Sequence, residues 1–149
     1  MRRNSARAAL ISAAALALTM IPLAGTSYAA SCSGTGCDNK GPVTYNCDAS
    51  VSTVRTLESN SRVAQLRWSH DCVAAWVRIT NNASPSVYTS YATIEKYDAA
   101  GNFIRSLSVT TPGYGGSDWS NMLGGSAYYY RICIRFDDDL YPLQCSTKW

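Results

Sequence analysis

Apolar and polar residues alternate along much of the chain, with the period of two that is typical of half-buried β-strands. The alternation is clearest in residues 63–69 and 126–136. Residues 87–97 and 102–109 also alternate, and the turn sequence DAAG between them predicts a hairpin. The other expected strands cover residues 52–57, 72–80 and 143–149.

Clusters of Gly, Ser, Asn and Asp separate the expected strands. The longest is the Gly-rich segment 110–125, which we expect to be a loop. Six to seven short antiparallel strands joined by such turns are typical of a small sandwich or barrel. The sequence therefore predicts an all-β fold.

Alternation also predicts which side chains share a face of each strand. In residues 126–136, Ile132 and Ile134 share one face, and Arg131 and Arg135 share the other. We expect the aliphatic faces to form the core. The other faces, which carry Arg, Tyr and Trp, have two interpretations. In the first, arginine stems cover the sheet while Trp76 fills a minor core. In the second, these faces form a binding surface, because Arg, Tyr and Trp are enriched at interfaces. The candidate interface residues are Arg67, Trp76, Arg78, Tyr129, Arg131 and Arg135.

The first 29 residues have the order of a secretory signal peptide. Three arginines precede an apolar run over residues 8–21, and Ser27 and Ala29 are the small residues of a cleavage site. The apolar run is shorter than the roughly 20 residues of a membrane span. We predict a cleaved signal peptide at 1–29 and a single secreted, extracellular domain at 30–149, with no membrane span.

Removal of this signal peptide changes the charge balance. The whole chain has 13 Lys and Arg residues against 10 Asp and Glu residues, and three of the arginines lie within the signal. The remaining domain therefore has a formal net charge of zero. Nucleic-acid binding needs a basic patch that neutralises phosphates, so we do not expect a nucleic acid as partner.

The cysteines lie in the predicted secreted domain, and their even number predicts up to three disulfides in an oxidising compartment. A metal site needs four ligands at favourable spacing, whereas the segment 32–47 has C-x4-C and C-x9-C spacings, so we expect no metal. The connectivity stays open, and the faces of Cys72 and Cys133 are compatible with a bridge between them. The expected disulfide cysteines are Cys32, Cys37, Cys47, Cys72, Cys133 and Cys145.

Candidate catalytic residues are few. His70 is the single histidine, and with Asp71 it would have to supply a Ser-His-Asp triad, but no G-x-S-x-G sequence surrounds a serine. We interpret His70 as a turn residue. The acidic run Asp137–Asp139 lacks the spacing of a calcium-binding loop and is interpreted as a solvated turn. The sequence thus predicts no catalytic residue and no cofactor.

A second candidate site lies in the Gly-rich segment. Tyr114, Asp118 and Trp119 combine aromatic faces with a short polar group, which is the chemistry of a sugar-binding platform. The interpretation that we favour is that Trp119 packs with Met122 beneath the loop, because a large aromatic side chain usually buries much of its area.

Two segments resemble a known family. CSGTGCDNKGPVTYNCDASVSTV at residues 32–54 and LRWSHDCVAAWVRI at residues 66–79 are similar to the YjfA-like family of small secreted proteins, a domain of unknown function. The resemblance implies an exported, disulfide-bonded β domain. It supplies no reaction and no catalytic residue.

Together these observations predict a secreted, non-catalytic binding module whose partner is another secreted protein. By analogy with the family, a specific version is an adaptor in an extracellular bacterial complex, such as a secreted toxin particle. One alternative is a module that binds glycan or cell wall, and another is a small extracellular hydrolase.

Overall fold

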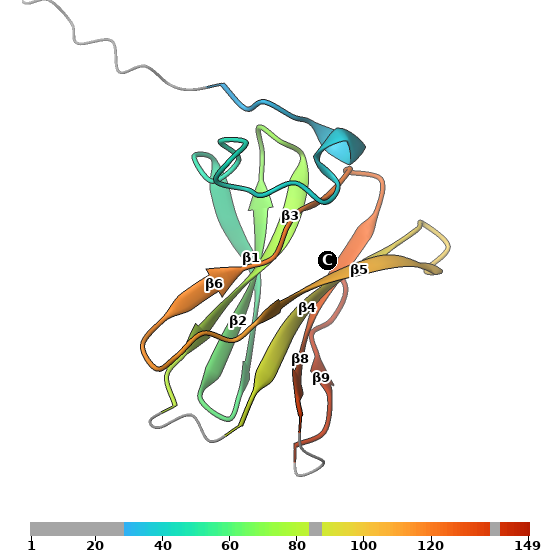
Figure 1. Cartoon of the computed structure of the whole chain (residues 1–149). Helices are drawn as coiled ribbons and strands as arrows, with labels where there is room; N and C mark the ends of the chain where they lie inside the picture. The colour runs from blue at the N-terminus through green and yellow to red at the C-terminus, as the bar shows by residue number, and fades with distance from the viewer. Residues whose placement is uncertain (1–28, 84–87, 138–140) are drawn as a thin grey trace, which may run out of the picture.

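The computed structural model describes residues 29–83, 88–137 and 141–149, which form two antiparallel sheets (Figure 1). A 3-10 helix, η1 (Gly34–Cys37), precedes the first strand. Sheet A has the order β1 (Val51–Ser59), β2 (Arg62–Ser69), β3 (Ala74–Asn81) and β6 (Ser117–Trp119), and β7 (Leu123–Gly124) also pairs with β3. Sheet B has the order β5 (Phe103–Thr110), β4 (Ser90–Tyr97), β8 (Tyr129–Phe136) and β9 (Gln144–Cys145).

The predicted signal peptide, apart from Ala29, lies outside the described residues, and so do Asp138 and Asp139. Within the part of the chain that the structure describes, no helix has the length and apolar character needed to cross a membrane.

Alternate residues of both sheets fill the space between them and form the main core. Val77 and Ile79 of β3 and Ile132 and Ile134 of β8 are fully buried there. Burying one such side chain contributes about 1.5–3 kcal/mol, so the aliphatic faces are the main source of stability. The all-β prediction is confirmed, and the architecture is a sandwich rather than a closed barrel, because in the described part of the chain no strand pairing joins the two sheets.

The segment 110–125, which the sequence predicts to be a loop, contains two short strands. β6 pairs Trp119 with Arg78, and β7 pairs Leu123 with Ala75. Neither strand is long enough to show alternation, and the glycines around them are typical of loops. The prediction of an uninterrupted loop is therefore wrong.

β3 begins at Ala74 rather than at Cys72, because residues 70–73 form a turn. Val73 has a φ of 49°, which lies in the left-handed region that β-branched residues rarely adopt. Its carbonyl oxygen accepts a hydrogen bond from the Gly125 backbone N–H at 2.8 Å. The predicted strand is thus two residues too long at its start.

The disulfides join Cys32 to Cys37, Cys47 to Cys72, and Cys133 to Cys145. All of the cysteines are therefore paired, as the sequence predicts. The bridge between Cys72 and Cys133 that the alternation allowed is wrong. Cys133 lies opposite Cys145 on sheet B, whereas Cys72 belongs to a separate cluster beside sheet A.

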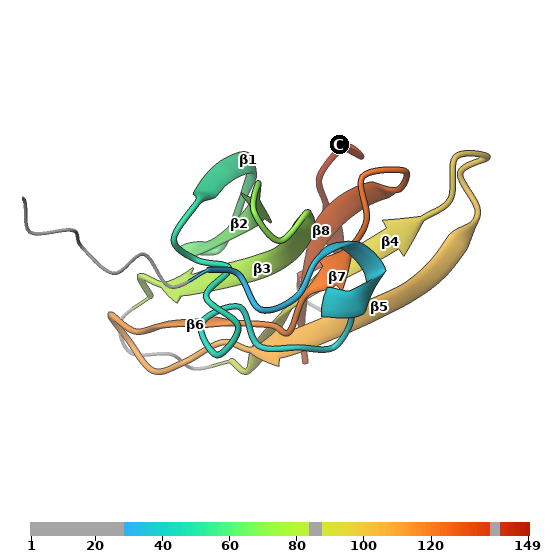
Figure 2. The same ribbon diagram turned by 90° about the horizontal axis from the view of Figure 1, so that it is seen from above.

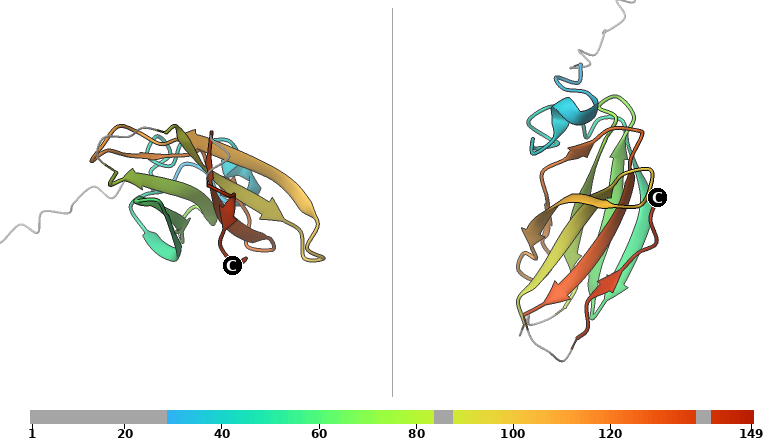
Figure 3. Two further views of the ribbon diagram at one scale, coloured as in Figure 1. Left: turned by 90° about the horizontal axis from the view of Figure 1, so that it is seen from below. Right: turned by 90° about the vertical axis from the view of Figure 1, so that its right-hand side faces the viewer.

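The cysteine-rich segment 29–47, which we call the cap, packs on the outer face of sheet A. It forms a second, smaller core in which Trp76 and Met122 are buried with Cys37, Cys47 and Cys72. Figure 2 shows η1 beside β7, and Figure 3 shows the cap at one end of the sandwich. The interpretation that Trp76 fills a minor core is thus confirmed.

Mass spectrometry can check the disulfide connectivity directly. In the native protein we expect iodoacetamide to modify no cysteine, and after reduction we expect it to modify all of them. Digestion without reduction should release linked peptides that contain Cys47 with Cys72 and Cys133 with Cys145. A peptide that links Cys72 to Cys133 would contradict the fold, because Cys72 lies in the turn before β3 and belongs to the cluster beside sheet A, whereas Cys133 lies on β8 of sheet B.

Candidate functional site

The strand register brings two rows of side chains together on the outer face of sheet A. In the first row, Arg67 of β2 lies opposite Trp76 of β3. In the second row, Gln65 lies opposite Arg78, and Arg78 lies opposite Trp119 of β6. Directly opposed residues of an antiparallel pair have Cβ atoms about 4.5–5.5 Å apart. Two arginines and two tryptophans from β2, β3 and β6 therefore form one cluster.

A groove of about 260 Å³ lies between this cluster and the cap, and we call it the sheet A groove. At the base of the groove Trp76 is buried, with 4% of its surface exposed, whereas Trp119 has 43% of its surface exposed. The cap contributes Val43, which is 49% exposed. The groove thus combines aromatic, aliphatic and cationic surface. Its lining residues are Pro42, Val43, Asp48, Val51, Arg67, Trp76, Arg78 and Trp119.

The two arginines of the groove are held by neutral partners. Arg67 donates to Thr53 Oγ1 at 2.6 Å and to Gln65 Oε1 at 3.4 Å, and Arg78 donates to Ser117 Oγ at 3.3 Å. Among the described residues, neither guanidinium forms an ion pair with a carboxylate. Burial, and secondly the charge of Arg78, lower the pKa of Arg67. The two guanidinium groups therefore give the groove an excess of positive charge over Asp48, the one carboxylate among its lining residues.

The residues of the predicted glycan site point in different directions. Trp119 lies opposite Arg78 and faces outward, while Asp118, one residue earlier, points to the other face of β6. Tyr114 is 66% exposed in the turn before β6. The expectation that Trp119 packs beneath the loop is wrong, because pairing in β6 directs it to the surface, but Met122 is buried as expected.

The remaining candidate interface residues lie on the outer face of sheet B, across the sandwich from the groove. Arg131 Nε lies 2.5 Å from Glu95 Oε2, and this hydrogen bond raises the pKa of Arg131. Arg135 lies 4.9 Å from the ring centroid of Tyr91, and Tyr129 is exposed. The structure therefore divides the candidate interface between two opposite faces, and on sheet B a carboxylate already neutralises Arg131.

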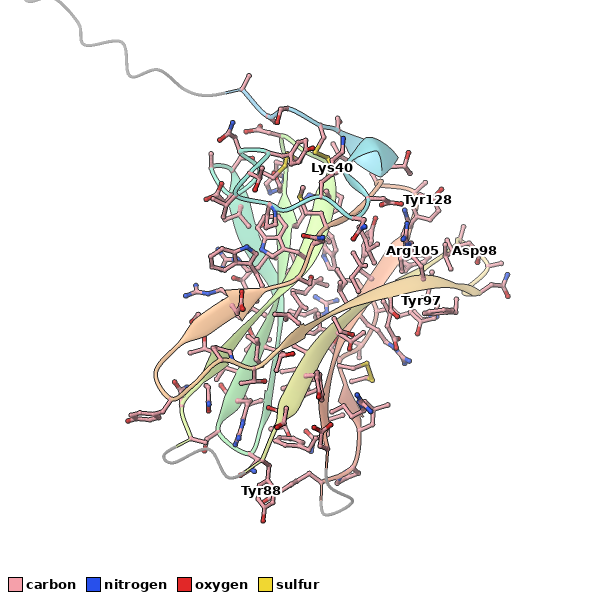
Figure 4. All side chains as sticks on the ribbon, in the orientation of Figure 1. Lys40, Tyr88, Tyr97, Asp98, Arg105 and Tyr128 are labelled. Atoms are coloured by element: carbon pink, nitrogen blue, oxygen red, sulfur yellow. A yellow bond between two sulfur atoms is a disulfide. The ribbon has the colours of Figure 1, made fainter. Side chains whose placement is uncertain are left out.

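An ion pair between a buried lysine and a partly exposed aspartate attaches the cap to the sandwich. Lys96 Nζ of β4 lies 3.5 Å from Asp38 Oδ2 and donates to the carbonyl oxygen of Gly124 at 2.6 Å. Asp38 Oδ1 accepts a hydrogen bond from the Gly124 N–H at 2.7 Å. Lys96 also lies 4.0 Å from the ring centroid of Tyr128, and Figure 4 shows Tyr128 near Arg105, a second cationic partner of Asp38. This cluster fixes the cap, and the cap forms one wall of the groove.

A second hollow, of about 250 Å³, lies beside the C-terminal residues, and we call it the aromatic hollow. The ring of Trp149 packs edge-on against Trp68 with 5.0 Å between centroids, and its backbone N–H donates to the Tyr130 carbonyl oxygen at 2.8 Å. This site could not be predicted from the sequence, because its tryptophans, Trp68 and Trp149, are far apart along the chain. Its lining residues, none of them charged, are Trp68, Ser126, Tyr128, Tyr129, Tyr130 and Trp149.

His70 is exposed in the turn after β2, and its Nε2 lies 3.4 Å from Ser52 Oγ. A catalytic triad also needs a carboxylate that orients the second ring nitrogen. Among the described residues, no carboxylate forms a hydrogen bond with this imidazole. Asp71 follows His70 in the sequence, but its carboxylate does not form the hydrogen bond that would orient the imidazole.

The Sγ atoms of four cysteines gather between the cap and the turn before β3, all within 4.8 Å of one another. Metal ligation requires thiolates, and the Cys32–Cys37 and Cys47–Cys72 disulfides occupy these sulfur atoms. The Cys47–Cys72 bridge therefore fastens the cap to the sandwich, and the Cys32–Cys37 bridge closes a loop within the cap.

The contribution of the cap to the groove was not predicted from the sequence. Pro42 and Val43 lie in a segment that the sequence identifies only as a cross-linked loop. Their position depends on the Cys47–Cys72 bridge, and connectivity cannot be deduced from one sequence. The available signal was the presence of two apolar residues within an otherwise polar segment.

Comparison with known proteins gives one result. A family model described as a protein of unknown function (DUF2690) matches residues 35–127. The match includes most of the cap, the strands from β1 to β7 and every lining residue of the sheet A groove. No curated protein and no solved structure matches the chain.

Proposed function

Because the chain belongs to the DUF2690 family of proteins of unknown function, its role has to follow from its surfaces, and we propose that it is a secreted, non-catalytic binding module. The partner is another secreted protein, which binds in the sheet A groove. The observation that carries the proposal is the groove itself, where Arg67, Arg78 and the exposed Trp119 lie together. Arginine and tryptophan dominate the binding energy of many protein interfaces.

The three disulfides support export, because such bonds persist in oxidising compartments. The proposed route is a signal peptide at residues 1–29. The resemblance of residues 32–54 and 66–79 to the YjfA-like family is consistent with this route. It also favours the more specific proposal of an adaptor in an extracellular bacterial complex, such as a secreted toxin particle.

Replacing Trp119 with alanine is expected to weaken partner binding by about 2 kcal/mol, or roughly 30-fold, as for a central interface residue. Isothermal titration calorimetry with the purified partner measures the effect. Phe103→Ala is the matched control, because Phe103 is an exposed aromatic residue of β5 outside the groove. Equal affinities for the Trp119→Ala variant and the native protein would remove the groove from the interface.

A second candidate function, glycan binding, is favoured by the aromatic hollow. Its rings offer a stacking surface, and the hydroxyl groups of Ser126 and Tyr129 add hydrogen-bonding groups without charge. We expect Trp149→Ala to reduce retention on peptidoglycan or chitin, and Trp119→Ala to leave retention unchanged. A selective loss with Trp119→Ala would instead favour the site formed by Tyr114, Asp118 and Trp119. Absence of retention for the native protein would end this candidate function.

A further inference from the structure

We infer that the sheet A groove binds an acidic peptide segment of the partner, whose Asp or Glu carboxylates are held by Arg67 and Arg78. This inference rests on the proposed binding function and adds the chemistry of the ligand. Three features support it: the spacing of the arginines, their lack of a carboxylate partner among the residues that the structure describes, and the apolar surface beside them.

The spacing of the two arginines suits an extended acidic chain. Arg67 lies opposite Trp76, and Arg78 follows Trp76 two residues later on the same face of β3. Arg67 and Arg78 are therefore diagonal neighbours on this face, and such neighbours are about 7–8 Å apart. Alternate residues of an extended peptide are about 6.6 Å apart, at 3.3 Å per residue. Two carboxylates at positions i and i+2 of a bound peptide can therefore each meet one guanidinium.

The charges of the groove favour an anion. Arg67 is partly buried beside Arg78, and burial together with this neighbouring charge disfavours its protonated form. Asp48 also lines the groove, but among the described residues it forms no ion pair with either arginine. A bound carboxylate would accept charge-assisted hydrogen bonds from the planar guanidinium groups, which match its geometry. It would also reduce the repulsion between the two cations.

The apolar part of the groove distinguishes a peptide from a simple polyanion. Trp119 and Val43 are both exposed at the groove, and Pro42 and Val51 also line it. A phosphate polymer would use the arginines and leave this apolar surface in water. An acidic peptide that also carries an apolar side chain contacts both parts, so it buries more apolar area on binding.

Selection from a display library of random peptides on the disulfide-bonded domain tests the inference. We expect enrichment of sequences that combine Asp or Glu with an apolar residue. The affinity of the best synthetic peptide should fall about tenfold for Arg67→Gln and for Arg78→Gln, because each variant loses a charge-assisted hydrogen bond. A peptide with Asn and Gln in place of Asp and Glu should bind more weakly by a similar factor.

Two controls separate lost binding from lost structure. Lys148→Gln removes a positive charge that lies over the ring of Tyr97 on sheet B, and it should leave the peptide affinity unchanged. Arg78→Gln should keep or raise the melting temperature, because it removes repulsion from Arg67. A purely structural role for Arg78 would instead lower that temperature.

The failures of the inference and of the proposed function are distinguishable. If the selected peptides require Trp119 but carry no acidic residues, the inference is wrong and the groove remains a binding site. If no selected peptide is affected by Trp119→Ala, both proposals fail. If polyphosphate binds more tightly than every acidic peptide and depends on the same two arginines, the assignment to a peptide is overturned.

Discussion

Replacing Lys96 with methionine is expected to lower the free energy of unfolding by about 3 kcal/mol, because it removes the buried cation of a partly buried ion pair. Lys96 is 2% exposed and holds both the carboxylate of Asp38 and the carbonyl oxygen of Gly124. Methionine fills a similar volume but leaves both oxygens without this donor. Unfolding in guanidinium chloride, followed by tryptophan fluorescence, measures the loss as a lower midpoint at an unchanged slope.

Lys148→Met is the matched control for this variant, because Lys148 is exposed and contacts Gly101 and the ring of Tyr97 at the surface. Surface substitutions of this kind change stability by about 0.5 kcal/mol or less. Since Asp38 belongs to the cap, Lys96→Met should also weaken the ligand binding that we propose for the sheet A groove. Similar decreases in the free energy of unfolding for Lys96→Met and Lys148→Met would contradict the structural role of the Lys96–Asp38 pair.

Replacing Gly124 with alanine is expected to lower the free energy of unfolding by about 3 kcal/mol or more, at the upper end for overpacking. A Cβ atom at this position would lie 1.8 Å from the carbonyl oxygen of Gly34 and 2.5 Å from its carbonyl carbon. These are backbone atoms, so the clash can be relieved only if η1 moves away from β7. That movement would also disturb the hydrogen bond from Gly124 N–H to Asp38. Thermal and denaturant unfolding of the purified variant measure the effect.

Gly36→Ala is the control, because Gly36 lies in η1, the helix that packs against β7. A Cβ atom at Gly36 would have no heavy atom within 4 Å among the described residues, apart from its own helix and its neighbours in the chain, so the substitution should change the free energy of unfolding by about 0.5 kcal/mol or less. A Gly124→Ala variant as stable as Gly36→Ala would show that the cap does not pack against β7 as described.

The long strands could be predicted because each has one face in the core, so apolar and polar residues alternate along it. In β3 and β8, each inward side chain meets the opposite sheet, so a polar residue there would be buried. The short strands β6 and β7 could not be predicted, because tertiary pairing with β3 determines them. The start of β3 was also not predicted. Val73 adopts a left-handed conformation, and a valine in the sequence does not indicate such a conformation.

The candidate site was predictable only in part. Alternation correctly places Arg67, Trp76 and Arg78 on one side of sheet A, but it cannot tell that β8 contributes its arginines to the opposite face. Alternation also puts Lys96 in phase with the buried Ile94 of β4. That phase was an available signal for a buried cation, although its partner Asp38 is supplied by the cap and is far away in sequence.

Affinity purification from the culture supernatant of the native host is the most direct test of the central claim, that the sheet A groove binds a secreted protein. The tagged native protein and an Arg78→Gln, Trp119→Ala double variant are compared, and mass spectrometry identifies what accompanies each. We predict that one protein accompanies the native form at a stoichiometric level and is absent from the variant. A native protein recovered as a lone monomer, or a partner retained equally by the variant, would contradict the account.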